Sequence, residues 1–94
     1  MFLIDIIFDA PLDVIDEHIG QHREYLAAHY ESGNLLFGGR KIPRCGGIIL
    51  TRLESRQEVE EIFNSDPLIL AKAAKYSIVE FEPVMRCAAL VGIV

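Results

Sequence analysis

The chain has 94 residues, of which 51% are hydrophobic, and its formal net charge is −5 at pH 7. This length fits one domain, expected over residues 1–94 with an apolar tail at 84–94, and it allows only a thin core. No run of about 18 apolar residues is present, so no membrane span is expected. The nine lysines and arginines are scattered without a basic stripe, so nucleic acid is not an expected partner.

The N-terminal stretch and the two cysteines exclude further classes of protein. Residues 1–5 have no basic segment and meet the acidic Asp5 at once, so we do not expect a signal peptide. Cys45 and Cys87 are too few for a disulfide framework, and their spacing matches no metal motif. We therefore expect a cytoplasmic protein that needs no metal or other cofactor.

The first predicted element is a strand over residues 2–8 that is apolar on both faces. One face holds the even-numbered residues Phe2, Ile4, Ile6 and Phe8. Asp5, on the other face, is the one polar residue of the strand. Its favoured interpretation is a carboxylate paired with a partner or placed at a cavity edge, and a catalytic role is the second interpretation.

A helix is predicted from Leu12 to about Ser32, with Pro11 near its first turn and Gly33 as its stop. At about 100° per residue, one apolar face holds Leu12, Ile15, Ile19, Leu26 and Tyr30. His22 falls at the edge of this face. The pattern alone favours a core-edge histidine bonded to backbone, but an imidazole also titrates near neutral pH and suits a proton-transfer site.

The same helix carries a row of three histidines, which raises the question of a metal. His18 and His22 are four residues apart and His29 follows on the same flank. However, residues 18 to 29 span about 16 Å along a helix, so one ion cannot bind all three. His18 and His22 alone, with Asp66 as a possible extra ligand, would form only a weak site, so metal binding is the minor interpretation of this row.

The remaining elements follow in a regular order. Strands are predicted at 35–39 and 48–53, then a helix capped by Ser55 and Glu58, a short helix opened by Asp66-Pro67 that runs to about 74, and a strand at 76–82. The tail after this strand has three open interpretations: an added strand, an arm that docks on a partner, or a loosely ordered segment.

This order of elements predicts an α+β fold of the ferredoxin-like type, with a four-stranded antiparallel sheet and the helices on one face. Two helical stretches cover only one side of such a sheet. Because the first and third strands are apolar on both sides, the other face needs a partner, and pairing of two sheets in a homodimer is the simplest solution. Higher oligomers remain open.

The residues assembled so far resemble the YciI-like (YCII-related) family of the dimeric α/β-barrel superfamily. The matching positions are His22, Tyr25-Leu26, Gly33, Gly39, Pro43-Arg44-Cys45-Gly46-Gly47, Asp66-Pro67 and Tyr76 to Phe81. They cover roughly residues 2 to 83. The resemblance implies a ferredoxin-like subunit that pairs into a dimer, and a site built from His22 and Asp66.

The candidate substrate-binding residues are Gly39, Arg40, Arg44 and Asp5. The chain departs from the family at Ile19, where many relatives carry an arginine, and at Arg40, where many carry a proline. Arg40 is therefore a candidate for the missing positive charge. Asp66 is also explained as a helix cap, whether or not it acts in chemistry.

The expected function is acid–base chemistry on a small organic molecule, of the lyase or isomerase type. A carboxylate beside His22 would orient the imidazole, which could then accept and return a proton. The alternative is a non-catalytic dimer that binds a small ligand, and the departures at Ile19 and Arg40 are compatible with it. The two hypotheses differ over whether His22 meets Asp66 beside an open pocket.

Overall fold

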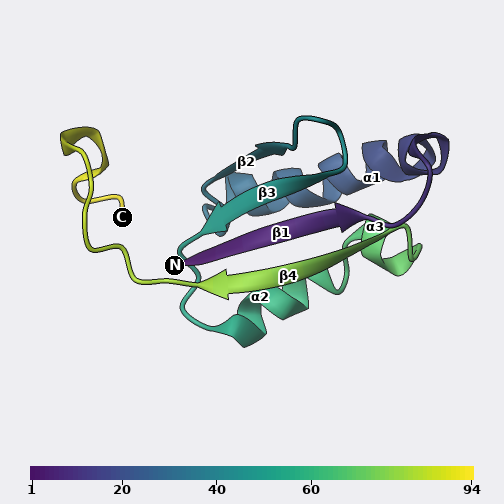
Figure 1. Ribbon diagram of the computed structural model, residues 1–94. Coiled ribbons are helices and arrows are strands. Elements are labelled where there is room, and N and C mark those ends of the chain that lie inside the picture. The colour runs from purple at the N-terminus through teal and green to yellow at the C-terminus, as the bar shows by residue number, and fades with distance from the viewer.

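All 94 residues are described in a computed structural model. Its elements, in chain order, are β1 (Phe2–Phe8), α1 (Leu12–Glu31), β2 (Phe37–Arg40), β3 (Gly46–Thr51), α2 (Arg56–Phe63), α3 (Pro67–Leu70), β4 (Ala74–Glu80) and a short 3-10 helix, η1 (Ala88–Leu90). Figure 1 shows the strands side by side with the three α-helices behind them.

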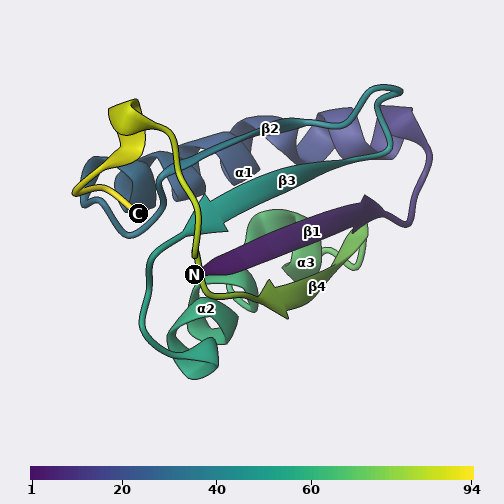
Figure 2. The same cartoon turned by 60° about the vertical axis from the view of Figure 1, so that its left-hand side comes forward.

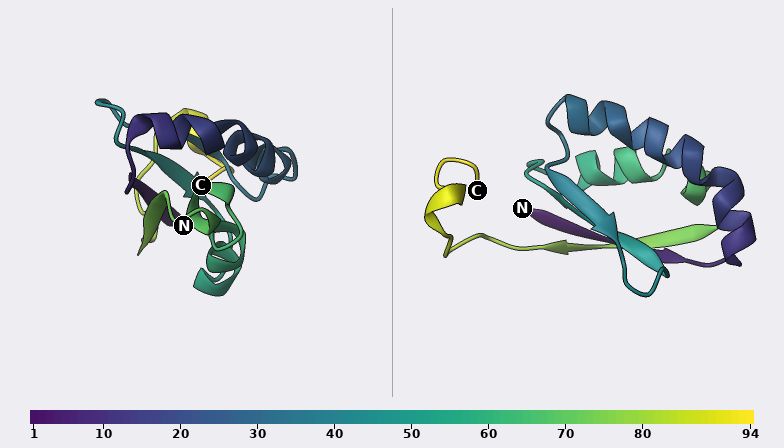
Figure 3. Two further views of the ribbon diagram at one scale, coloured as in Figure 1. Left: turned by 90° about the vertical axis from the view of Figure 1, so that its right-hand side faces the viewer. Right: turned by 90° about the horizontal axis from the view of Figure 1, so that it is seen from above.

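The strands form one antiparallel sheet in the order β2-β3-β1-β4. All three α-helices lie on one side of this sheet, as the view from above in Figure 3 shows. This strand order, with a helical connection after β1 and another after β3, is the ferredoxin-like α+β arrangement that the sequence predicts.

The core lies between the sheet and the helices. Phe2, Ile4 and Ile6 of β1 point to the helix side and are almost completely buried. The helices contribute the buried residues Ile15, Leu26, Val59, Ile62, Phe63 and Leu68. Burial of each large apolar side chain stabilises the fold by about 1.5–3 kcal/mol, so this layer holds α1 at a fixed position over the sheet.

Local signals place the ends of α1 and α2 as predicted. Gly33 follows α1 with a φ of 83°, a conformation that glycine adopts without strain. The Ser55 side chain accepts a hydrogen bond from the Glu58 backbone N–H, and the Glu58 carboxylate accepts from the Ser55 backbone N–H, which completes the predicted capping box.

Three strands and one helix differ from their predicted bounds. β2 begins two residues later than predicted, whereas β3 and β4 each begin two residues earlier. The helix α3 ends at Leu70, whereas the sequence predicts that it runs to about residue 74. Gly46 and Gly47 belong to β3 because they pair with Ile7 and Ile6 of β1, and a Cβ atom at Gly46 would lie 1.9 Å from the Ile6 carbonyl oxygen. Strand pairing, rather than propensity, decides these bounds.

The face of the sheet away from the helices carries a row of apolar residues across all four strands. The pairing register aligns Phe37, Leu50, Leu3 and Val79. We call these four residues the outer row. Phe37 and Val79 are 62% and 52% exposed, so no other part of the chain covers the ends of the row.

The tail leaves the sheet after β4 and projects beyond the N-terminal end of β1 (Figure 2). It forms η1 and no strand, and the Arg52 side chain donates a hydrogen bond to the Ile93 carbonyl. Val84 and Met85 are exposed. No helix of the structure has the length and apolar character that crossing a membrane requires.

Candidate functional site

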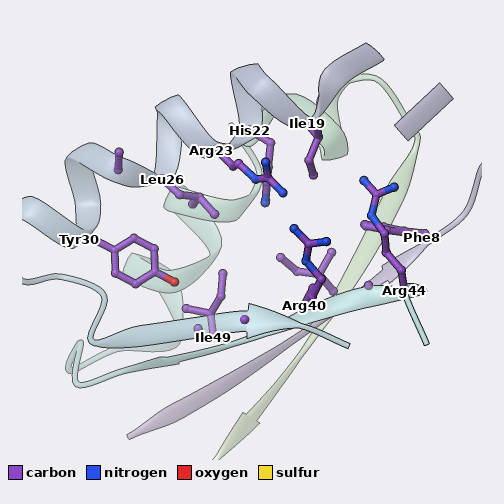
Figure 4. Close-up of a pocket in the computed structure, with 15 residues that line it drawn as sticks. Phe8, Ile19, His22, Arg23, Leu26, Tyr30, Arg40, Arg44 and Ile49 are labelled. Atoms are coloured by element: carbon purple, nitrogen blue, oxygen red, sulfur yellow. The ribbon is translucent and has the colours of Figure 1, made fainter. Parts of the chain in front are cut away.

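A pocket of about 610 Å³ opens between α1 and the β2–β3 hairpin (Figure 4). Its apolar wall consists of Ile6, Phe8, Ile19, Leu26, Ala27 and Ile49. Its polar side chains are those of His22, Arg23, Tyr30, Arg40 and Arg44. A cavity of this size with a few convergent polar groups is typical of a small-molecule site.

His22 joins this pocket to a buried carboxylate. Its Nδ1 atom lies 2.7 Å from Oδ2 and 2.9 Å from Oδ1 of Asp66, although the two residues are 44 positions apart. The His22 side chain is 13% exposed and that of Asp66 is 1% exposed. Because a carboxylate accepts, Nδ1 carries the proton, and Nε2 is the ring nitrogen left for a ligand.

Asp66 is held in place by a second role. Its Oδ1 atom accepts a hydrogen bond of 2.9 Å from the Leu68 backbone N–H, which caps the first turn of α3. Pro67 occupies the first helical position, so the Asp-Pro pair fixes both the cap and the carboxylate. Asp66 does not line the pocket, and its carboxylate contacts His22, which does.

A hydrogen bond from Tyr25 connects α1 to α2, the helix that precedes Asp66. The Tyr25 hydroxyl donates a 2.6 Å hydrogen bond to the carbonyl of Ile62, the penultimate residue of α2. Burial, and then the negative charge of Asp66, raise the pKa of the Tyr25 hydroxyl, which therefore stays a donor at neutral pH. Tyr25 and His22 follow one another on the same flank of α1, so both bonds fix the rotation of that helix.

The pocket is rich in positive charge and has no acidic lining residue. Arg44 is paired with Asp16 on α1 at 2.6 Å, and this hydrogen bond lowers the pKa of the Asp16 carboxyl. Arg23 and Arg40 have no ion-pair partner in the chain. In Figure 4 the Arg40 side chain rises from the hairpin toward α1.

Tyr30 reaches the opposite end of the pocket. The hydroxyls of Tyr25 and Tyr76 bond to Ile62 and Asn64, whereas that of Tyr30 has no hydrogen-bond partner in the chain. A Cβ atom at Gly38 would lie 2.6 Å from the Tyr30 hydroxyl oxygen and 2.6 Å from the Ile48 carbonyl oxygen. Gly38 thus leaves the space that the Tyr30 ring end occupies.

The structure brings most of the candidate residues together and separates one of them. Gly39, Arg40 and Arg44 line the pocket with His22. Asp5 lies on the outer face of the sheet, where Lys41 approaches its carboxylate to 2.5 Å. The expectation that Asp5 contacts the ligand is therefore corrected: β-strand alternation points its side chain away from the helices, and the carboxylate is paired with Lys41.

The three histidines of α1 have different surroundings. His29 packs edge-on against Tyr25, and its Nδ1 atom lies 3.4 Å from the Asn34 side-chain nitrogen. His18 is half-buried and does not line the pocket. Among the three, only His22 meets both a carboxylate and the pocket.

Sequence reasoning did not identify Arg23 and Tyr30 as pocket residues. Tyr30 was assigned only to the apolar face of the helix, because hydrophobic periodicity does not report where a hydroxyl points. Arg23 follows His22 directly in the chain. Its position on the helix does not show which strand lies opposite it, and so does not show that it lines a pocket. In the structure, β2 and β3 form the wall of the pocket that faces this part of α1.

Comparison with known proteins agrees with this architecture. The solved structure of 5-chloro-2-hydroxyhydroquinone dehydrochlorinase from Burkholderia phenoliruptrix AC1100, in complex with 2,5-dihydroxybenzoquinone, is similar with a TM-score of 0.72 and 19% sequence identity. The match covers 87% of this chain and 94% of that one. No curated protein sequence matches. The sequence profile of the YCII-related domain matches residues 1–82, and the chain therefore belongs to the YCII-related family.

Proposed function

We propose that this chain is a small-molecule enzyme in which His22, oriented by Asp66, transfers a proton to and from a ligand in the pocket. The observation that carries the proposal is the 2.7 Å contact between His22 Nδ1 and Asp66 Oδ2 beside an open, partly apolar pocket. In this arrangement Nε2 is the base, and the carboxylate stabilises the imidazolium that forms when Nε2 takes a proton.

The proposed chemistry is of the lyase or isomerase type. Eliminations and proton-shift isomerisations both begin when a base removes a proton from carbon, and a single histidine can return that proton at a second position. The structural neighbour is named a dehydrochlorinase, and loss of hydrogen chloride also needs a proton acceptor. Gly39, Arg40 and Arg44 line the pocket opposite α1 and are the proposed ligand contacts.

We also propose that two copies pair through their sheets. The outer row presents Phe37, Leu50, Leu3 and Val79 on a face that no helix of the chain covers. Apolar side chains in one band across a sheet favour association with a second apolar face. A cytoplasmic location completes the proposal and rests on two free, exposed cysteines.

A ligand screen followed by product analysis tests the proposed function. Wild type and His22→Ala are compared by thermal shift against hydroquinones, quinones and small cyclic acids, including 2,5-dihydroxybenzoquinone. Compounds that stabilise the wild type are then incubated with both proteins and separated by chromatography. We expect conversion of at least one of them by wild type and none by His22→Ala. Equal conversion by both proteins would contradict the proposal.

The non-catalytic alternative is supported by Ile19, which lines the pocket where many relatives carry an arginine. The non-catalytic alternative predicts that some compounds bind the wild-type protein and are recovered unchanged after long incubation. The same screen separates the two functions, because binding and conversion are measured on the same compounds.

A further inference from the structure

We propose that the ligand of this pocket is a small organic carboxylate, bound with its negative group on Arg40 and its apolar body against Ile19, Leu26 and Ile49. The inference rests on the proposed function only for the location of the site. It adds the chemical class of the ligand, which neither the His22–Asp66 contact nor the dehydrochlorinase likeness specifies.

The charge of the pocket is opposite in sign to that of the whole chain. The chain as a whole carries a net charge of −5, yet three of the 15 pocket residues are arginines and none is acidic. A concave surface lined by one sign of charge concentrates ions of the opposite sign. The pocket therefore favours binding of an anion, although the protein as a whole is negatively charged.

Arg44 and Arg40 differ in their partners. Arg44 is already bonded to Asp16 at 2.6 Å, which orients it and neutralises part of its charge. Arg40 has no carboxylate partner in the chain, and its guanidinium extends over the pocket toward α1 (Figure 4). A guanidinium presents paired N–H donors whose geometry matches the two oxygens of a carboxylate.

The opposite end of the pocket holds the hydroxyl group of Tyr30. The Tyr30 hydroxyl has no partner in the chain, and burial raises its pKa, so it remains a protonated hydrogen-bond donor at neutral pH. A carbonyl or hydroxyl oxygen on the ligand can accept this hydrogen bond. With a carboxylate on Arg40 and an oxygen at Tyr30, the ligand spans the pocket below His22 (Figure 4).

Matched pairs of probes test the charge requirement directly. Benzoate and salicylate are titrated by calorimetry against wild type, each beside its uncharged amide, benzamide or salicylamide. The variants are Arg40→Gln, Arg40→Lys and Arg56→Gln. Arg56 is exposed at the start of α2, outside the pocket, so its substitution removes the same charge from the protein without touching the site.

We expect at least one carboxylate to bind wild type more tightly than its amide, with a preference that weakens as salt is added. Arg40→Gln should reduce carboxylate affinity about tenfold and leave amide affinity unchanged, because it removes a charge-assisted hydrogen-bond pair. Arg40→Lys should keep part of the preference, and Arg56→Gln should keep all of it.

Three results would overturn the inference: amides that bind as tightly as the acids, carboxylate binding that Arg40→Gln and Arg56→Gln weaken equally, or no binding of either acid. None of these probes needs to be converted. Loss of conversion in His22→Ala together with equal binding of acids and amides would leave the proton-transfer proposal standing and reject the carboxylate. Equal conversion by wild type and His22→Ala, together with preferential binding of the acids, would reject the proton-transfer proposal and leave the carboxylate inference standing.

Discussion

Nδ1 of His22 lies 2.7 Å from Oδ2 of Asp66, and the same carboxylate caps α3 through the Leu68 N–H. The buried carboxylate of Asp66 thus caps the first turn of α3 and also orients the imidazole of His22. The ring is held in the tautomer with its proton on Nδ1, so that Nε2 is free to accept a proton from the pocket side.

Substitution Asp66→Asn should reverse the tautomer of His22 while the fold is kept. The asparagine oxygen can still accept from Leu68, and its amide group then donates to Nδ1, which places the ring proton on Nε2. Nitrogen-15 NMR of the histidine rings distinguishes the two tautomers. A His22 ring that keeps its proton on Nδ1 in the variant would show that Asp66 does not set the tautomer.

Substitution Asp66→Ala should destabilise the protein more than loss of an ordinary helix cap. It removes the partner of the Leu68 N–H and leaves His22 Nδ1 without an acceptor, so we expect a cost of about 3 kcal/mol. Ser55→Ala, which removes the exposed cap of α2, is the matched control, with an expected cost of about 1 kcal/mol. Urea unfolding measures both, and equal costs would contradict this account.

Adjacent glycines should respond differently to alanine. A Cβ atom at Gly38 would lie 2.6 Å from the Ile48 carbonyl oxygen and from the Tyr30 hydroxyl, whereas nothing lies within 4 Å of one at Gly39. We expect Gly38→Ala to cost about 1–3 kcal/mol and to displace the Tyr30 ring, and Gly39→Ala to fold normally. Thermal unfolding and the Tyr30 ring resonances would show the difference.

Charge placed on the outer row should dissociate the proposed dimer. Val79, which is 52% exposed at one end of that row, is replaced by lysine, and sedimentation velocity reports the mass. Ile42→Lys is the control, because Ile42 is 96% exposed in the loop between β2 and β3 and is not part of the row. We expect a monomer only for Val79→Lys. A monomeric wild type would reject sheet pairing.

All three tyrosines should titrate above the range of free tyrosine. Burial raises the pKa values of Tyr25, Tyr30 and Tyr76 above their ordinary value of 10.0. The folded state therefore holds protons that the unfolded state loses, so the contribution to stability is full below pH 10.0 and declines as pH rises through the folded pKa values. Absorbance titration of folded and unfolded protein measures this, and a tyrosine with its ordinary pKa in the folded protein would contradict it.

The sequence predicts the features that depend on local chemistry. A short, almost entirely apolar run predicts β1, helical periodicity and Gly33 predict α1, and Ser55 with Glu58 predicts the start of α2. The bounds of β3 and β4 were displaced because Gly46 and Ala74 join strands only through pairing with β1. Propensity contains no information about that pairing.

The site was less accessible to sequence reasoning because it depends on long-range geometry. His22 and Asp66 meet although 44 positions separate them in the chain, and in the sequence only the family resemblance connects them. Asp5 was misplaced because β1 is apolar on both faces, so its pattern does not reveal which face the helices cover. Arg23 and Tyr30 reach the pocket through the rotation of α1, which packing against the sheet decides.

The central claim is that Nε2 of His22 moves protons on a bound ligand. It is tested by incubating each compound that stabilises the protein in deuterium oxide with wild type or His22→Gln, and measuring deuterium incorporation into the ligand by mass spectrometry. A glutamine amide can still donate to Asp66, so the carboxylate keeps a partner. Our account predicts incorporation with wild type and only the uncatalysed rate with His22→Gln at equal ligand occupancy, whereas equal incorporation by the two proteins would contradict it.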